Sequence, residues 1–268
     1  MKNALPPLLD DLRLRLARAP HVLLAVDFDG TLAPIVDRPQ DAALPPRTAD
    51  CLRELTQSPD CSIAVVSGRS ISDLRPRIGL DVIYAGNHGL EIEGPGISFV
   101  HPTANVLRDA VEIASWDLEA AFLTVPGVLV ERKGLTATLH YRQARAELAD
   151  WIATTVRLIL GPYRECLTLV RARKAWEIRP RTAWNKGAAV RYLLDRLPVR
   201  PLLVCAGDDT TDEDMFSVTS DAISIRIGRG VRTRARYLIR ECDFLSCLQL
   251  LQSACGNSVA LCVPANVS

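Results

Sequence analysis

Short apolar runs with few polar interruptions recur in both outer parts of the chain, and a turn of small or charged residues follows most of them. They lie in residues 21–30, 61–70, 81–89, 200–209 and 222–228. Such runs are typical of parallel strands that are buried on both faces. Amphipathic stretches, such as residues 45–58 and 185–197, separate several of them. Because predicted strands and helices alternate, we expect an α/β fold with a parallel sheet and helices on both of its faces.

The middle of the chain has a different pattern. Residues 103–123 and 144–160 each predict a helix, whereas residues 127–142 and 166–180 have the pattern of paired strands. Strands that are joined by tight turns form antiparallel sheets, which can leave one face polar. We therefore predict that an α+β module, with an antiparallel sheet and helices, is inserted into the parallel-sheet domain.

The domain boundaries are predicted from this change of pattern. Residues 1–100 and 181–252 would form the two parts of the core, and residues 101–180 the inserted cap. Residues 253–268 carry no motif, and we expect them to form a loosely ordered C-terminal tail.

The composition argues against several classes of protein. The 32 basic and 31 acidic residues nearly cancel, so we expect no nucleic-acid partner. The first 20 residues carry charges throughout and lack the apolar segment of a signal peptide. No apolar run approaches the roughly 20 residues that span a bilayer. We therefore expect a cytoplasmic protein without membrane contact.

The chain has eight cysteines, and none of them form a CxxC pair. This spacing argues against a zinc site. We expect free thiols, several of them packed as small hydrophobic side chains. A disulfide among the last four cysteines, Cys242, Cys247, Cys255 and Cys262, remains an alternative.

Two aspartates end the first predicted strand, in the stretch DFDGT. Asp27 and Asp29 are two residues apart, so both carboxylates can face one side while Phe28 faces the core. Ligands of open parallel sheets gather at the carboxyl ends of the strands. We therefore expect both carboxylates to reach into a functional crevice, with a solvated turn as the alternative.

A second acidic turn, GDDTTDED, follows the strand predicted in residues 200–209. A helix N-terminus tolerates acidic residues, which accounts for the later ones but not for Asp208 and Asp209 at the strand end. Crowded carboxylates repel each other unless a cation binds them. Oxygen ligands of this kind suit Mg²⁺, so we predict a magnesium site.

Other polar turns supply groups for an anion. Ser67 offers a hydroxyl, and the SGRS turn, with Gly68 and Arg69, offers backbone N–H groups to phosphate oxygens. Lys186 begins a predicted helix, where a cation is unfavourable beside the helix dipole. Its position in a chain with few lysines indicates an anionic partner.

The stretches DFDGTL, VVSGRS, NKG and GDDTTDED, in this order, resemble the four motifs of haloacid dehalogenase superfamily phosphatases, over roughly residues 22–250. The resemblance implies a Rossmann-like core with a mobile cap, and Mg²⁺ as cofactor. It also implies that Asp27 is the nucleophile that forms an aspartyl phosphate, and that Asp29 is first the general acid and then the general base. Lys186 and Ser67 would stabilise the transferring group.

The same resemblance assigns the metal ligands. Mg²⁺ would be held by Asp27, by the backbone carbonyl of Asp29 and by Asp208. Asp209 and Asp212 would either contact these ligands or serve as alternate ligands to the metal.

A finer resemblance is to the trehalose-6-phosphate phosphatases. GNHGLEI, VERKGLTATLHYR and WEIRP are similar to segments of that family, and GDDTTDE is its most discriminating signature. The family hydrolyses trehalose 6-phosphate to trehalose and phosphate. The candidate sugar-binding residues are Asn87, His88, Glu131, Lys133, His140, Arg142 and Glu177. A structural role for His88, and a solvated sheet face for the charged residues of the cap, are the alternatives.

Three functions therefore remain open. The first is hydrolysis of trehalose 6-phosphate, and the second is hydrolysis of another sugar phosphate, such as a sucrose or mannosylglycerate phosphate. The third is a non-catalytic phosphatase-like domain that binds a partner. This third function is disfavoured because the chain retains all four residues that the chemistry needs, Asp27, Asp29, Lys186 and Asp208. We expect a monomer, and trehalose-6-phosphate synthase is the one protein partner that the resemblance suggests.

Overall fold

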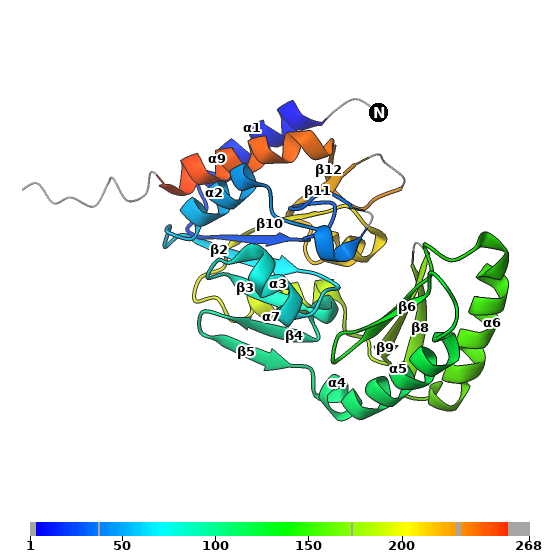
Figure 1. The fold of residues 1–268 in the computed structure, drawn as a ribbon. Helices are drawn as coiled ribbons and strands as arrows, with labels where there is room; N and C mark the ends of the chain where they lie inside the picture. Colours follow the sequence, from blue (N-terminus) through cyan, green and yellow to red (C-terminus); the bar gives the residue numbers. More distant parts are fainter. Residues whose placement is uncertain (1–3, 37, 173, 229–231, 257–268) are drawn as a thin grey trace, which may run out of the picture. The chain divides into compact units, whose positions relative to one another are not determined.

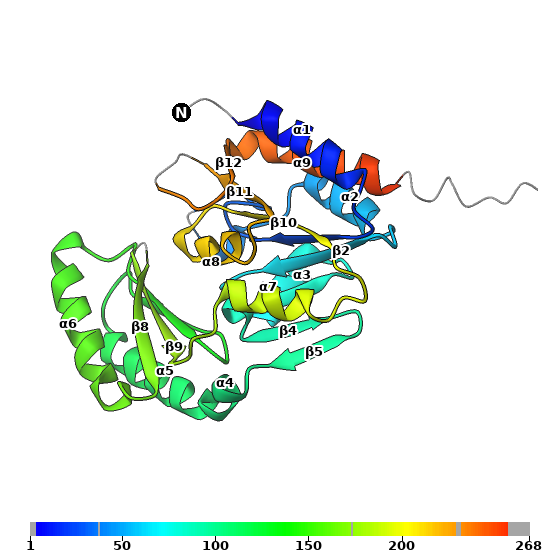
Figure 2. The same ribbon diagram turned by 180° about the vertical axis from the view of Figure 1, so that it is seen from behind.

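The computed structural model describes residues 4–36, 38–172, 174–228 and 232–256. The chain divides into two compact units, one made of Met1–Ser98 and Trp184–Ser268 and the other of Phe99–Ala183. The first unit holds a largely parallel sheet, and the second holds an antiparallel sheet (Figures 1 and 2). The predicted α/β class with an inserted α+β module is confirmed.

The sheet of the first unit has the strand order β12-β11-β10-β1-β2-β3-β4-β5. Its parallel strands are β1 (Val22–Val26), β2 (Cys61–Val66), β3 (Ile83–Gly86), β10 (Leu202–Gly207), β11 (Ile223–Ile227) and β12 (Tyr237–Ile239). All five residues of β1 are buried, because helices cover both faces of the sheet at its centre. In the register of this centre, Leu24 lies opposite Ile63 on β2 and Val204 on β10.

Helices pack on both faces of this sheet. The apolar sides of α1 (Leu5–Leu16), α2 (Pro46–Leu55), α3 (Ile71–Ile78) and α9 (Phe244–Gly256) share one core cluster with the sheet. Figures 1 and 2 show α1, α2 and α9 side by side over one face, and α7 (Lys186–Leu194) on the opposite face. The short helix α8 (Glu213–Phe216) connects β10 to β11. Single 3₁₀ turns complete the unit at Pro39–Asp41, Asn87–Gly89, Thr210–Asp212 and Glu241–Asp243.

The end of the first segment differs from the sequence prediction. We predicted one strand over residues 81–89, but β3 ends at Gly86 and the chain then turns through the left-handed conformations of Asn87 (φ 50°) and His88 (φ 59°). A hairpin of β4 (Glu91–Gly94) and β5 (Ile97–Val100) follows, and β4 pairs antiparallel with β3. Left-handed backbone at residues other than glycine is uncommon, so we did not predict this turn.

The start of the predicted C-terminal tail is also helical. Helix α9 extends to Gly256 because Leu251 and Cys255 are buried against the core. The rest of the predicted tail, with Cys262, lies outside the described residues.

The second unit has an antiparallel sheet in the order β6-β7-β9-β8. Its strands are β6 (Leu129–Arg132), β7 (Ala137–His140), β8 (Leu167–Ala172) and β9 (Ala175–Pro180), and its helices are α4 (Pro102–Val106), α5 (Arg108–Phe122) and α6 (Ala149–Leu160). Turns of 3₁₀ type flank α6 at Ala146–Leu148 and Gly161–Tyr163. Apolar side chains of α5 and α6 pack with those of β7, β8 and β9 in one core. Glu131, Thr138 and Glu177 form a row across β6, β7 and β9 in the strand register.

Two predicted elements of this unit have different limits. The helix predicted over residues 103–123 is divided at Leu107, whose angles (φ −90°, ψ 6°) leave the helical region between α4 and α5. The strand predicted up to Arg142 ends at His140, because the chain turns there and Ala144 N–H donates to the carbonyl of Tyr141. Among the described residues, no helix has both the length and the apolar character that crossing a membrane requires.

Candidate active site

The centre of the site is Asp27, the first residue after β1. Its backbone N–H donates to the carbonyl of Ala206 on β10 at 3.0 Å, which extends the pairing of the two strands by one residue. Phe28 is fully buried, as its predicted position facing the core requires. Asp27 itself is only 5% exposed. A carboxylate at this depth needs charged or polar partners.

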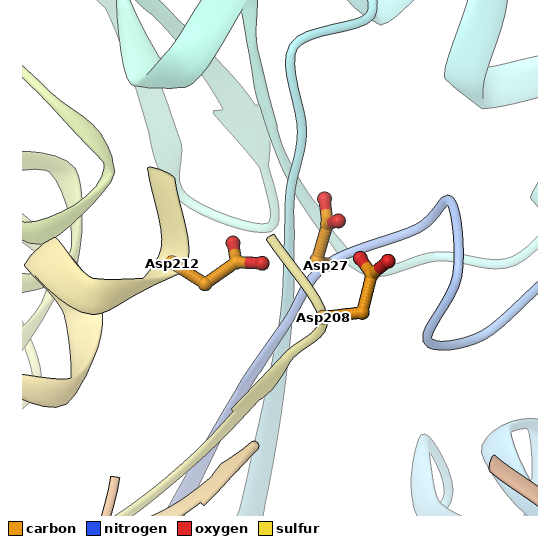
Figure 3. Close-up of side chains that lie close together, drawn as sticks. All are labelled: Asp27, Asp208 and Asp212. Carbon is orange, nitrogen blue, oxygen red and sulfur yellow. The ribbon is translucent and has the colours of Figure 1, made fainter. Parts of the chain in front are cut away.

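Two more carboxylates supply part of that environment. Ligand oxygens of Asp27, Asp208 and Asp212 all lie within 4.8 Å of one another. Asp208 follows β10, and Asp212 ends the 3₁₀ turn that precedes α8. Figure 3 shows the three side chains gathered at the carboxyl ends of the neighbouring strands β1 and β10. This is the edge of the sheet at which the sequence predicted a site.

Lys186 lies between two of these carboxylates. Its Nζ donates to Asp27 Oδ1 at 2.8 Å and to Asp212 Oδ1 at 2.7 Å, and its side chain is 3% exposed. Helix α7 begins at Lys186, with the Asn185 side chain as its N-cap. The predicted conflict with the helix dipole is therefore offset by two anionic partners.

The ionisation of the site reflects burial and crowding. Burial raises the pKa of Asp27 well above its usual range, Lys186 opposes this shift, and Asp212 adds to it. Burial, followed by the charges of Asp212 and Asp209, raises the pKa of Asp208 to about 7. Burial alone would lower the pKa of Lys186, but the two carboxylates beside it raise it. Three carboxylates face one ammonium group, so the site has room for a further positive charge.

Two glycines allow the carboxylates to come this close. Gly30 has φ 76°, and a Cβ atom added there would collide with the Asp208 carboxyl group. A Cβ atom at Gly207 would collide with the Asp212 carboxyl group. The glycine of DFDGT therefore serves both the left-handed turn and the packing of Asp208.

The donor set fits Mg²⁺. The ligand atoms are carboxylate oxygens alone, and hard cations such as Mg²⁺ prefer oxygen ligands. The raised pKa of Asp208 indicates a carboxylate that gains stability from a bound cation. Asp27, Asp208 and Asp212 are therefore the residues that could hold the metal.

Two residues that we predicted as metal ligands lie outside this group of three. Asp209 is exposed and caps the 3₁₀ turn, where its side chain accepts from Thr210 N–H at 2.7 Å. The Asp29 carboxylate instead accepts two hydrogen bonds from Arg69, from Nε at 2.6 Å and from Nη2 at 2.7 Å. A role for the Asp29 backbone carbonyl remains a prediction.

Arg69 is committed to partners within the protein. Besides Asp29, its guanidinium donates to Asp73 Oδ2 at 2.6 Å and to the carbonyl of Pro39 at 2.9 Å. Asp73 also accepts from Arg77, which donates in turn to the carbonyl of Ala42. The network joins the start of α3 to the loop after β1, and it fixes the orientation of the Asp29 side chain. The predicted use of Arg69 as a substrate ligand would have to compete with these bonds.

The strand-end turns of β2 and β3 are held together. Ser67 is buried and its Oγ accepts from Arg69 N–H at 3.2 Å, while its carbonyl accepts from His88 N–H at 2.8 Å. The His88 ring lies against Gly68, where an added Cβ atom would be 2.7 Å from it. Asn87 Nδ2 donates to Glu91 Oε1 at 2.7 Å. These contacts give Asn87 and His88 structural roles, and their contact with a substrate remains a prediction.

The charged residues predicted in the cap partly come together. We define the cap group as Glu131, Lys133, His140 and Glu177. Glu131 Oε2 lies 2.8 Å from His140 Nε2 and 3.5 Å from Lys133 Nζ, and Glu177 accepts a hydrogen bond from Arg179. Arg142 is exposed in the turn after β7 and does not belong to this row.

Three residues that support the predicted site residues were not predicted from the sequence. Asp73 and Arg77 support Arg69, and Arg179 pairs with Glu177. The Thr31 Oγ1 atom is also buried, and it neither donates nor accepts a hydrogen bond with any residue that the structure describes. Asp73 and Arg77 are four residues apart on a helix, a spacing at which opposite charges can pair. The sequence could therefore have indicated this ion pair.

Comparisons with known proteins agree with this geometry. A family model described as trehalose-phosphatase matches residues 25–236. The trehalose-phosphate phosphatase of Mycobacterium marinum is 37% identical over 216 residues, which cover 78% of this chain and 54% of that protein. An uncharacterized glycosyl hydrolase of Mycobacterium tuberculosis is 36% identical over 255 residues, which cover 91% of this chain and 19% of that protein. The chain thus spans about half the length of the trehalose-phosphate phosphatases that it matches, and a smaller part of the glycosyl hydrolase.

A solved structure has the same fold. The C-terminal domain of the trehalose-6-phosphate phosphatase of C. albicans aligns with a TM-score of 0.77 and 25% identity, over 93% of this chain and 96% of that one. Sequence motifs, fold and family model therefore agree, and the chain belongs to the trehalose-phosphatase family.

Proposed function

We propose that this chain is a Mg²⁺-dependent phosphatase that hydrolyses trehalose 6-phosphate to trehalose and phosphate. The observation that carries the proposal is the buried ion cluster at the ends of β1 and β10, in which Lys186 bridges Asp27 and Asp212 beside Asp208. Charges at this depth cost stability unless they are paired. A cluster with more carboxylates than cations is expected where a cation and an anionic substrate bind together.

Asp27 is the proposed nucleophile. Its Oδ1 is held by Lys186, which leaves Oδ2 free of that bond for attack on the phosphorus atom. The attack would form an aspartyl phosphate and release the sugar, and water would then hydrolyse the aspartyl phosphate. Lys186 would stabilise negative charge on the phosphoryl oxygens during both steps. When bound by Asp27, Asp208 and Asp212, Mg²⁺ would neutralise further charge on these oxygens.

Asp29 is the proposed general acid for the leaving sugar oxygen and the general base for the attacking water. Its carboxylate is held by two hydrogen bonds from Arg69, and Asp73 and the carbonyl of Pro39 fix Arg69 in turn. We propose that Arg69 is a positioning residue for Asp29. A misplacement of a catalytic group by about 1 Å can lower the rate by about 100-fold.

The substrate assignment is supported by the relatives and by the cap group. Relatives 37% and 38% identical to this chain are named trehalose-phosphate phosphatases. A disaccharide presents many hydroxyl groups, and the cap group offers carboxylate acceptors beside ammonium and imidazole groups. We propose that Glu131, Lys133 and Glu177 bind sugar hydroxyls. Association with trehalose-6-phosphate synthase, a monomeric state and a cytoplasmic location remain predictions.

The test is phosphate release from trehalose 6-phosphate, glucose 6-phosphate and sucrose 6-phosphate, each with Mg²⁺ and with a chelator. We expect release from trehalose 6-phosphate alone, and its loss with the chelator. Release of phosphate from another sugar phosphate would support the proposed phosphatase reaction but contradict the proposed substrate. No release from any of them, by a folded protein, would favour a non-catalytic binding domain.

A further inference from the structure

Cys61 and Cys255 come together in the first unit although 193 residues separate them in the sequence. Cys61 begins β2, and Cys255 lies in the last turn of α9. Both belong to the core where α2 and α9 pack, and Figures 1 and 2 both show these two helices side by side. A hydrogen bond between the Glu54 and Gln252 side chains ties the same two helices.

Ser58 connects the two cysteines. The backbone N–H of Cys61 donates to the Ser58 carbonyl at 3.3 Å, and Ser58 Oγ donates to the Cys255 carbonyl at 3.1 Å. The two thiol side chains lie close enough to interact with each other. The backbones at the two cysteines are therefore fixed relative to each other through one buried serine, independently of the thiols.

The two sulfur atoms have unequal chemistry. The interaction with Cys61 lowers the pKa of the Cys255 thiol, against the opposing effects of burial and Asp60. The same interaction, together with burial, raises the pKa of the Cys61 thiol. A thiolate that accepts a hydrogen bond from a neighbouring thiol is the usual arrangement of an attacking and a resolving cysteine. Cys61 is partly exposed, which gives a small oxidant access to the pair.

We propose that Cys61 and Cys255 form a reversible disulfide that ties the end of α9 to the start of β2. Hydrogen peroxide is the oxidant class. The Cys255 thiolate attacks one peroxide oxygen, the O–O bond breaks, and a sulfenic acid forms while hydroxide leaves. Cys61 sulfur then attacks the sulfenic sulfur, the S–O bond breaks, and water leaves with the Cys61 proton. Two thiols are oxidised and one peroxide is reduced to two waters.

The site is separate from the proposed catalytic centre and does not depend on the proposed function. Cys61 and Ser67 lie at opposite ends of β2, about 20 Å apart for an extended strand. The disulfide would close a long loop and so restrict the unfolded chain. We therefore expect oxidation to raise the melting temperature by about 5 °C or more while the structure of the catalytic centre is retained.

The experiment treats reduced full-length protein with hydrogen peroxide, blocks the remaining thiols, and maps disulfide-linked peptides by mass spectrometry. We expect a Cys61–Cys255 link that dithiothreitol reverses, and a melting temperature that rises on oxidation. In C61S, dimedone should label Cys255 as a sulfenic acid, and the melting temperature should not rise on oxidation. C51S is the matched control, since Cys51 is buried in the same core, and it should keep the link.

Three results would overturn the proposal. One is the absence of the link in oxidised wild-type protein, which needs no variant to fold. Another is a link from Cys255 to Cys242, Cys247 or Cys262. The third is a linked protein whose melting temperature is unchanged, because a bond that closes this loop must restrict the unfolded chain.

Discussion

The proposed catalytic centre and the cap group are both clusters of charged side chains, but they differ in burial. A charged cluster that is more deeply buried is stronger evidence for a function. In the proposed catalytic centre, Asp27, Lys186 and Asp212 are at most 5% exposed, and the two carboxylates share one ammonium group. In the cap group, the exposed fractions of the side chains range from 10% to 32%: Lys133 10%, Glu177 17%, His140 28% and Glu131 32%. A fully buried ion cluster costs stability and needs a reason, whereas a partly exposed row also fits a solvated sheet face. The first group therefore supports a reaction, and the second supports only a substrate preference.

The largest expected effect comes from removing the proposed nucleophile. D27N should lower kcat by about 10⁴-fold or more on every phosphate ester, because an amide in place of the Asp27 carboxylate cannot form the proposed covalent intermediate. Phosphate release and a thermal melt on the same sample check this. A folded D27N protein that keeps a tenth of the activity would show that the buried centre does not perform the chemistry.

The next contrast separates two neighbouring aspartates. D208N should lower kcat/KM by about 10²–10³-fold, because it removes a predicted metal ligand, whereas D209N should cost less than about tenfold, because Asp209 only caps a turn. Titration with Mg²⁺ should require more metal for D208N alone. Equal losses in the two variants would contradict the ligand group that the structure brings together.

Loss of a positioning residue should have an intermediate effect. R69Q should lower kcat by about 10²-fold with little change in KM, because the Asp29 carboxylate loses its two hydrogen bonds. R75Q is the matched control, since Arg75 on the following helix α3 pairs with Glu93 on an exposed surface and lies over the Tyr84 ring, and it should be near wild type. A large rise in KM for R69Q, with kcat kept, would instead make Arg69 a substrate ligand.

Substitutions in the cap group should weaken the binding of the sugar and leave the rate of the chemical step unchanged. E131Q and K133M should each raise KM for trehalose 6-phosphate by about tenfold, because each removes a charged hydrogen-bond partner worth roughly 1.5 kcal/mol. The kcat/KM for p-nitrophenyl phosphate, which has no sugar, should stay within about twofold. Equal losses on both substrates would assign these residues to phosphate binding or to stability.

The last contrast needs no substitution and concerns pH. Because the pKa of Asp208 is raised to about 7 in the metal-free protein, Mg²⁺ must displace a proton below that pH. The apparent Mg²⁺ affinity should therefore fall by about tenfold per pH unit below pH 7 and level off above it. Calorimetric titrations from pH 5.5 to 8.5 check this, and an affinity that is constant over the range would contradict the assignment.

The sequence predicted those parts of the fold that follow from local pattern. The continuous apolar runs predicted β1, β2 and β10 because a strand buried on both faces has no polar side. The break at Leu107 and the left-handed turn at Asn87 and His88 were missed, because the pattern of apolar and polar residues does not report single backbone angles.

The candidate site followed the same rule. Asp27, Asp208 and Lys186 were predicted because each is at a strand end or a helix start where its charge has no structural reason. The sequence could not distinguish Asp209 from Asp212, since the fold of the GDDTTDED turn decides which carboxylate faces Asp27. It also could not predict that Arg69 pairs with Asp29, a contact between residues 40 positions apart.

The central claim is that Asp27 accepts the phosphoryl group, and trapping that group tests it most directly. The protein is mixed with trehalose 6-phosphate and Mg²⁺, quenched with acid, and treated with borohydride, which reduces an aspartyl phosphate to homoserine. We predict homoserine at position 27 in the wild type, and none in D27N or in the chelator control. Turnover of the substrate with no modification at position 27, or with the modification at another aspartate, would contradict it.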